Sequence, residues 1–228
     1  MRVIKILYIG KQYFFLVLLP IILLLTTTYV YHAANKLTGK VVVVDAGHGG
    51  IDPGANRPGI VEKDINLAIV LELKNQLNQY GAIVVLSRQA DVEISSECDN
   101  EKVRGRYHRD LAARVELVEE SDADLFVSIH ANAVTNAKRH GAEVFYYTKS
   151  EVGKALANSI QEQLDKVTQS SQAAQKADYF VLRRNKIPAA LIEVGYITNK
   201  DERQLLQDPE YQRKLAKAIA AGICNYYQ

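Results

Sequence analysis

Two histidines and a glutamate in this sequence have the residue types and surroundings of a catalytic metal site. His48 lies in the glycine-rich turn 47–50, directly after an apolar run, and His130 directly follows the apolar run 125–129. With Glu62 they form a set of two imidazoles and one carboxylate, which can hold a catalytic zinc ion and leave one coordination position open for water. The same ligands bind other divalent ions, so these residues predict a hydrolytic metal centre without fixing the metal.

Each candidate ligand also has a structural interpretation that needs no metal. A histidine in a glycine turn can simply hydrogen-bond that turn, and His48 fits both interpretations equally well. A glutamate in the first turn of a helix is stabilised by the helix dipole by roughly 0.3–1 kcal/mol. Considered alone, Glu62 fits this helix-stabilising role better than it fits metal binding. Spacing in the sequence therefore does not prove the site.

Glu193 is the candidate for acid–base chemistry. It interrupts the apolar stretch 189–197, where an unpaired carboxylate is costly to bury. A buried ion pair is the structural alternative. Because ionisable groups in perturbing surroundings concentrate at functional sites, we predict a functional role for Glu193.

Other features of the sequence argue against competing chemistries. Ser128 lies near a histidine, but no Gly-x-Ser-x-Gly segment surrounds it, which disfavours a serine triad. The turn 47–50 lacks the Lys-Ser/Thr pair of a phosphate-binding loop. His108 and His140 lie in charged, polar surroundings, and we expect both to be exposed. No basic cluster is interleaved with aromatic residues, so nucleic acid is not an expected partner.

The elements that must position these residues alternate between strand and helix along the chain. The predicted strands are 41–44, 82–87, 125–129, 143–148, 179–182 and 189–192, and the predicted helices are 62–80, 111–119, 151–167 and 210–224. Residues 91–106 lack periodicity and read as a long surface loop. This alternation predicts an α/β fold with a largely parallel central sheet flanked by helices. Ligands bind at the carboxyl edge of such sheets, where His48, His130 and Glu193 are expected to lie.

The composition fits one globular domain with a short additional segment. Of the 228 residues, 48% are hydrophobic and 24% are charged. All acidic residues lie at Asp45 or later, and the part of the chain after the first three basic residues is close to neutral. Cys98 and Cys224 are far apart in the sequence, and an exported location would permit a disulfide between them without requiring one.

The additional segment is an apolar run at residues 13–31. A helix of that length would measure ~28 Å, close to the thickness of a bilayer core. Three basic residues precede the run, namely Arg2, Lys5 and Lys11. By the positive-inside rule they predict a cytoplasmic start and an extracytoplasmic remainder.

A cleavable signal peptide is the alternative interpretation of this run. Cleavage after Ala33 or Ala34 would need a small residue two positions earlier, where Tyr31 and His32 stand. We therefore predict a single-pass signal anchor. Residues 1–35 would form the anchor and the start of a tether, and residues 36–228 would form the catalytic domain, outside the cell membrane.

Five segments together resemble the signature motifs of the zinc-dependent N-acetylmuramoyl-L-alanine amidases, and they occur in the family's order. They are residues 45–50 (DAGHGG), 52–55 (DPGA), 62–64 (EKD), 128–132 (SIHAN) and 192–199 (IEVGYITN). The resemblance extends from about residue 41 to the C-terminus. It implies that His48, Glu62 and His130 bind Zn²⁺ and that Glu193 is the catalytic carboxylate. Arg114 also matches a position of the family.

The resemblance implies a peptidoglycan hydrolase that cleaves the amide bond between the lactyl group of N-acetylmuramic acid and the L-alanine of the stem peptide. The short anchored architecture is similar to the CwlD-like, germination-specific amidases of spore cortex maturation. This similarity implies a location in the space between the forespore membranes. It also implies two partners, namely a protein activator and a deacetylase that acts on the product. Another zinc peptidoglycan hydrolase, such as a peptidase or deacetylase, is the alternative enzyme. A non-catalytic wall-binding module would be expected to lack Glu193 or a metal ligand.

Overall fold

The computed structural model describes residues 16, 18–26 and 36–228 of the chain. The chain divides into two compact units, residues 1–36 and residues 37–228. In the first unit, Leu16 and residues 18–26 are helical, and the remainder of the predicted membrane anchor at 13–31 lies outside the described residues. Among the described residues, no helix combines the length and the apolar character needed to cross a membrane.

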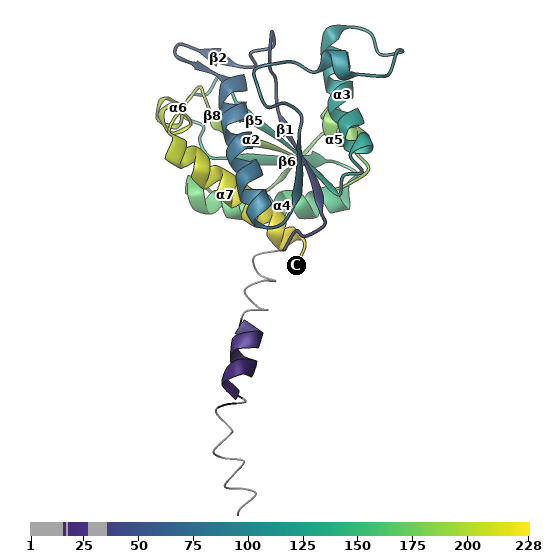
Figure 1. Ribbon diagram of the computed structural model, residues 1–228. Coiled ribbons are helices and arrows are strands. Elements are labelled where there is room, and N and C mark those ends of the chain that lie inside the picture. Colours follow the sequence, from purple (N-terminus) through teal and green to yellow (C-terminus); the bar gives the residue numbers. More distant parts are fainter. Residues whose placement is uncertain (1–15, 17, 27–35) are drawn as a thin grey trace, which may run out of the picture. The chain divides into compact units, whose positions relative to one another are not determined.

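A six-stranded sheet forms the centre of the second unit (Figure 1). Its strand order is β4 (Ile83–Leu86), β1 (Val41–Ala46), β5 (Leu125–Asn132), β8 (Ala189–Tyr196), β6 (Glu143–Tyr147) and β7 (Gln175–Ala177). The pairs β1–β4, β1–β5, β5–β8 and β6–β7 are parallel, and only β6–β8 is antiparallel. The predicted α/β fold with a largely parallel sheet is confirmed, and the carboxyl ends of β1, β5 and β8 meet at one edge.

Helices cover both faces of this sheet. One face packs against α2 (Glu62–Gln79), α4 (Glu151–Thr168) and α7 (Pro209–Tyr226), and the other packs against α3 (Arg106–Glu120) and α5 (Phe180–Arg184) (Figure 1). Successive strand residues point to opposite faces. Accordingly Val42 and Val44 belong to the core beneath α2, whereas Val43 belongs to the core beneath α3.

This alternation decides which face each site residue occupies. In β5, Leu125, Val127 and Ile129 are packed on the α2 face, so His130 points to the α3–α5 face. In β8, Ala190 and Ile192 are likewise packed on the α2 face, which directs Glu193 to the α3–α5 face. The two predicted site residues therefore project from neighbouring strands into the same space.

The predicted strand at 179–182 is wrong. Tyr179 precedes α5, in which Val181 and Leu182 are buried against the sheet, and the strand in this region is β7, which ends two residues before Tyr179. A run of four apolar residues is too short for its periodicity to distinguish a strand from a helical turn.

Helix α3 begins five residues before the predicted start at Leu111. Its first turn is polar and carries no apolar periodicity, but Asp110 in it binds Arg114 one turn later and accepts a hydrogen bond from the backbone N–H of Ile94. The predicted loop 91–106 is mostly irregular and contains the short 3₁₀ helix Ser95–Glu97. Burial of Ile94 and Cys98 against α3 holds this loop in place.

The remaining helices and strands follow the predictions closely, with three short additions. The sequence did not predict the two-stranded hairpin β2 (Asn56–Arg57) and β3 (Ile60–Val61) or helix α6 (Lys200–Leu205). The side chain of Asn199 starts α6 by accepting hydrogen bonds from two backbone N–H groups, those of Asp201 and Glu202. Cys98 and Cys224 are both buried and are not joined by a disulfide.

Candidate metal centre and active site

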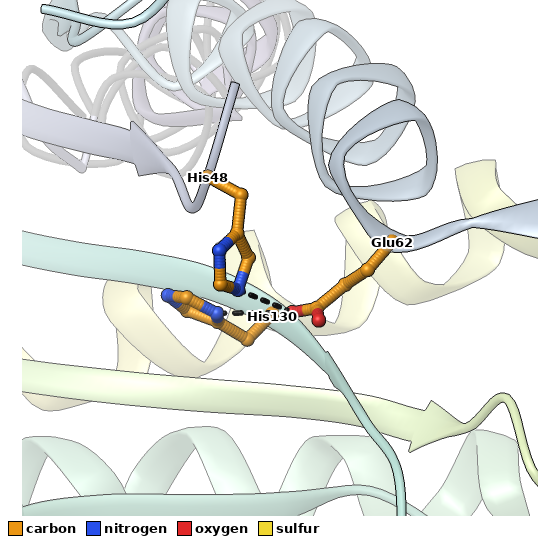
Figure 2. Close-up of side chains that lie close together, drawn as sticks. All are labelled: His48, Glu62 and His130. Atoms are coloured by element: carbon orange, nitrogen blue, oxygen red, sulfur yellow. Dashed lines mark hydrogen bonds and ion pairs between the residues drawn. The ribbon is translucent and has the colours of Figure 1, made fainter. Parts of the chain in front are cut away.

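The three predicted ligands converge at the carboxyl edge of the sheet, as Figure 2 shows. His48 comes from the turn after β1, His130 from β5 and Glu62 from the first residue of α2. Nε2 of His48 and Nδ1 of His130 each lie 3.1 Å from Oε1 of Glu62, and one ligand atom of each residue lies within 4.8 Å of the others. The imidazole rings are 4.9 Å apart at an angle of 80°. Both rings thus direct a nitrogen toward the same carboxylate.

The His48 side chain is held by its own turn. His48 has a φ of 62°, a left-handed conformation that is uncommon outside glycine. Its Nδ1 lies 2.9 Å from Oδ2 of Asp52, an outer carboxylate that fixes the ring and leaves Nε2 for the site. Burial alone would lower the pKa of His48, but hydrogen bonds and charges from Glu62 and Asp52 raise it to about 9.

Two buried arginines hold the backbone of this turn. Arg114 donates to the carbonyl oxygens of Ala46 and His48, each at 3.1 Å. Arg88 donates to the carbonyl oxygens of Ala46 at 2.9 Å and Gly47 at 3.1 Å. Both arginine residues are 3% exposed. Their charged hydrogen bonds to the backbone carbonyls therefore stabilise the strained conformation at His48.

The charge of Arg114 is balanced by two carboxylates. Arg114 forms an ion pair with Asp45 and donates from Nε to Asp110 at 2.9 Å. Burial alone would raise the pKa of Asp45, but Arg114 and a hydrogen bond from Ser128 lower it below its ordinary value. Ser128 is therefore occupied by a structural hydrogen bond, in agreement with the absence of a serine triad.

Glu62 is held in place from both sides of its carboxylate. Oε2 accepts a hydrogen bond from the N–H of Ala55 at 2.8 Å, and Oε1 accepts one from the N–H of Ala131 at 3.2 Å. Burial alone would raise the pKa of Glu62, but the neighbouring His130 and His48 lower it far below its ordinary value. The carboxylate is consequently charged, as a metal ligand must be.

Two glycines allow the three ligands to approach each other. A Cβ on Gly54, whose φ is 65°, would lie 2.6 Å from Oε2 of Glu62 and 2.7 Å from Cδ2 of His48. A Cβ on Gly47 would overlap the ring of His130. Since side chains are excluded where the ligands meet, and the donors are two imidazoles and a charged carboxylate, the residues fit a zinc ion.

Glu193 lies beside this ligand cluster. It is paired in register with His130 on the neighbouring parallel strand, and its Oε2 is buried without a hydrogen-bond partner among the described residues. Burial raises the pKa of Glu193 to about 7; the charge of His130 opposes the rise and that of Glu62 adds to it. A carboxylate with a pKa near neutrality can both accept and return a proton.

One cavity of about 340 Å³ joins these residues. His48, His130 and Glu193 all line it. His108 and His140 are exposed, as predicted, and neither belongs to the ligand cluster found among the described residues.

Several residues that support the site were not assigned a role from the sequence. Asp52 lies four residues after His48, and this spacing in a turn was the available signal for its role. For Arg88 and Asp45 the sequence provided only a weak indication of a role in the site. Each is a charged residue at or just after the end of an apolar strand. Arg114 matched a family position, and the structure now gives that position a specific contact with the His48 turn.

Comparisons with known proteins agree with this geometry. The family described as N-acetylmuramoyl-L-alanine amidase (Amidase_3) matches residues 42–225. The germination-specific N-acetylmuramoyl-L-alanine amidase of Bacillus subtilis (strain 168) is 37% identical over 193 residues, which cover 84% of this chain and 81% of that protein.

The solved structures that are similar to the chain include two other amidases. The CwlD amidase from Clostridioides difficile, in complex with the GerS lipoprotein, is 41% identical with a TM-score of 0.77, and the match covers 82% of this chain and 98% of that chain. The catalytic domain of CwlV, an N-acetylmuramoyl-L-alanine amidase from Bacillus (Paenibacillus) polymyxa var. colistinus, is 34% identical with a TM-score of 0.70. That match covers 82% of this chain and 97% of the other.

Proposed function

Because this chain belongs to the N-acetylmuramoyl-L-alanine amidase family of the Amidase_3 type, we propose that it hydrolyses the amide bond between the lactyl group of N-acetylmuramic acid and the L-alanine of the stem peptide. The observation that carries the proposal is the convergence of His48, Glu62 and His130 beside Glu193, whose buried Oε2 has no partner among the described residues. A ligand cluster and an unpaired carboxylate in one cavity provide the parts of a metallohydrolase.

The proposed cofactor is zinc, held by His48, Glu62 and His130. When bound there, zinc would supply a Lewis acid that polarises the scissile carbonyl and lowers the pKa of a water molecule to about 7. Asp52 keeps the His48 ring in the orientation that binding requires. Arg114 and Arg88 keep its backbone in the left-handed conformation.

Glu193 would carry the proton through the reaction. As water attacks the lactyl carbonyl carbon, Glu193 accepts the proton that the water loses. When the carbon–nitrogen bond breaks, Glu193 donates that proton to the departing alanine nitrogen, and the products are the free lactyl carboxylate and the stem peptide. Its pKa of about 7 suits both transfers.

Product analysis separates this activity from those of other zinc peptidoglycan hydrolases. The full-length protein is supplied with zinc and incubated with purified peptidoglycan, and the products are identified by mass spectrometry. Glycan strands with free lactyl groups, together with intact stem peptides that begin with alanine, are the expected result. Shortened peptides that remain attached to the glycan would identify a peptidase, loss of acetyl groups would identify a deacetylase, and no hydrolysis would favour a wall-binding module.

A role in spore cortex maturation is the finer part of the proposal. It is supported by the similarity to the germination-specific amidase of B. subtilis and the CwlD amidase of C. difficile. The CwlD structure contains a lipoprotein, so we extend the proposal to a protein activator of this chain. The resemblance to the cortex amidases also leads us to propose a deacetylase that acts on the stripped muramic acid. The relevant compartment would be the space between the forespore membranes.

We also propose that the catalytic domain remains attached to the outer side of the membrane by residues 13–31. The apolar side chains described within this segment, from Leu16 to Leu25, are largely exposed, and such a surface requires a lipid or protein cover. Cell fractionation should recover the full-length chain with membranes, and protease added outside intact protoplasts should remove the domain. A soluble exported form that begins near Asn35 would instead identify a cleaved signal peptide.

A further inference from the structure

The active-site cavity extends beyond the residues that the reaction requires. Besides His48, His130 and Glu193, side chains from the first residues of α3 and α5 line it. These two helices cover the sheet face to which His130 and Glu193 point. The cavity therefore has a second part, between the reacting groups and the α3–α5 layer, that none of the proposed catalytic steps uses.

Two tyrosines give this second part its character. Tyr107 in α3 is 57% exposed and Tyr179 before α5 is 41% exposed, although both line the cavity. Neither phenol hydroxyl has a hydrogen-bond partner among the described residues. The Tyr179 ring lies perpendicular to the ring of Phe145 at 5.7 Å, and this contact orients it. Exposed aromatic rings with unused hydroxyls can contact a ligand that has both apolar C–H groups and hydroxyls.

The remaining lining of this part is apolar or acidic. Leu111, Val181 and Leu191 supply the apolar surface, and Asp52 and Asp178 supply carboxylates. We call this part of the cavity, with Tyr107 and Tyr179, the tyrosine subsite.

Three arginines in or near the tyrosine subsite are already ion-paired. Arg114, which lines the cavity, is buried against Asp45 and Asp110. Nearby in the sequence, Arg106 pairs with Glu93 and Arg183 pairs with Asp178 at 2.9 Å. The guanidinium of Arg184 lies over the ring of Phe180 at 5.5 Å. Asp178 is thus paired, and Asp52 is paired with Nδ1 of His48. The charges of both carboxylates are therefore balanced, and the described residues that line the subsite include no unpaired cation.

This charge distribution distinguishes the two halves of the proposed substrate. The stem peptide ends in a carboxylate, and a lining without an unpaired cation offers that carboxylate no partner. A pyranose ring is uncharged; its C–H faces suit tyrosine rings, and its hydroxyls suit carboxylates and phenols. From this complementarity we propose that the tyrosine subsite binds the sugar ring of the muramoyl group, and that the stem peptide leaves the cavity in another direction. The proposal rests on the proposed amidase function.

A binding experiment tests the subsite without requiring turnover. The zinc-loaded full-length protein in detergent is titrated with the peptide-free disaccharide of N-acetylglucosamine and N-acetylmuramic acid, and binding is followed by saturation-transfer NMR. Replacing both tyrosines (Tyr107→Ala with Tyr179→Ala) should weaken disaccharide binding by about tenfold, the scale of two lost ring contacts. The paired change to phenylalanine, which keeps both rings, should retain most of the affinity. Tyr226→Ala, in α7 on the opposite face, is the control and should bind as the wild type does.

Kinetics with two substrates show which half of the substrate the tyrosines contact. The alanine pair should raise KM for a muramoyl peptide and should leave hydrolysis of the matching D-lactoyl peptide, which lacks the sugar, unchanged. An equal loss on both substrates, or unchanged disaccharide binding, would overturn the sugar assignment, and selective loss on the lactoyl peptide would place the stem peptide there. A wild-type protein that binds the disaccharide but hydrolyses neither substrate would reject the proposed function and leave the subsite standing.

Discussion

Replacement of Glu193 by glutamine should abolish most turnover while leaving the metal in place. The amide has the size of the carboxylate but neither accepts the proton of the attacking water nor returns one to the alanine nitrogen. A positioned acid–base group contributes roughly 10²–10⁴ in rate, so kcat of Glu193→Gln should fall by about 100-fold or more. Zinc content by atomic spectroscopy should stay at the wild-type level, because the proposed ligands are His48, Glu62 and His130. Rates are measured on a defined muropeptide.

The folded state provides the control for this experiment. Burial raises the pKa of Glu193 to about 7, which means that its surroundings disfavour the charged form. Removing that charge is expected to leave the thermal unfolding temperature of Glu193→Gln at or above the wild-type value. A near wild-type rate in the folded variant would show that Glu193 is not the proton carrier. An empty metal site in this variant would show that Glu193 is itself a ligand.

The central strands and helices were predictable because the residue pattern of each single segment indicates its secondary structure. The valines of β1 are buried on both faces of the sheet, and a strand of this kind appears in the sequence as an uninterrupted β-branched run. Helix α2 repeats its buried residues at helical spacing, at Ile65, Ile69, Leu73 and Leu77. The positions of His48 and His130 followed from these elements, since each residue lies close to the carboxyl end of a buried strand.

The supporting contacts could not be predicted because they join distant segments. Arg114 reaches the carbonyl of a residue 66 positions earlier, and Arg88 reaches one 42 positions earlier. No local periodicity records such pairs. The same limit explains the error at residues 179–182, where tertiary packing of Val181 and Leu182, rather than local pattern, selects a helix. It also explains why the tyrosine subsite was not predicted, since Tyr107 and Tyr179 are distant in the sequence and line one cavity only because α3 packs against α5.

Replacement of Glu62 by alanine should remove zinc and activity together. Glu62 is the proposed ligand whose oxygen faces both imidazoles at 3.1 Å, and alanine deletes that donor and leaves two histidines. Loss of an outer-shell partner typically weakens metal binding by about 10–100-fold, and loss of a direct ligand should exceed that range. Calorimetric titration of metal-free protein with zinc measures the affinity, and muropeptide hydrolysis measures the activity. Chelation of the wild type should produce the same loss of activity, which added zinc should reverse.

Glu72→Ala is the matched control, because Glu72 lies in the same helix and, among the described residues, its side chain makes only a 3.7 Å ion pair with Arg213. Glu72→Ala should bind zinc and hydrolyse muropeptide as the wild type does. A loss in this variant would show that removing any glutamate from α2 disturbs the site. His130→Ala should behave like Glu62→Ala, since both remove a donor from one cluster.

If Glu62→Ala keeps its zinc while Glu193→Gln loses it, the two glutamates exchange roles: Glu193 is the ligand, and Glu62, between the two histidines, moves the proton. If the wild type remains fully active after verified removal of zinc, the residues at this edge of the sheet do not form a metallohydrolase.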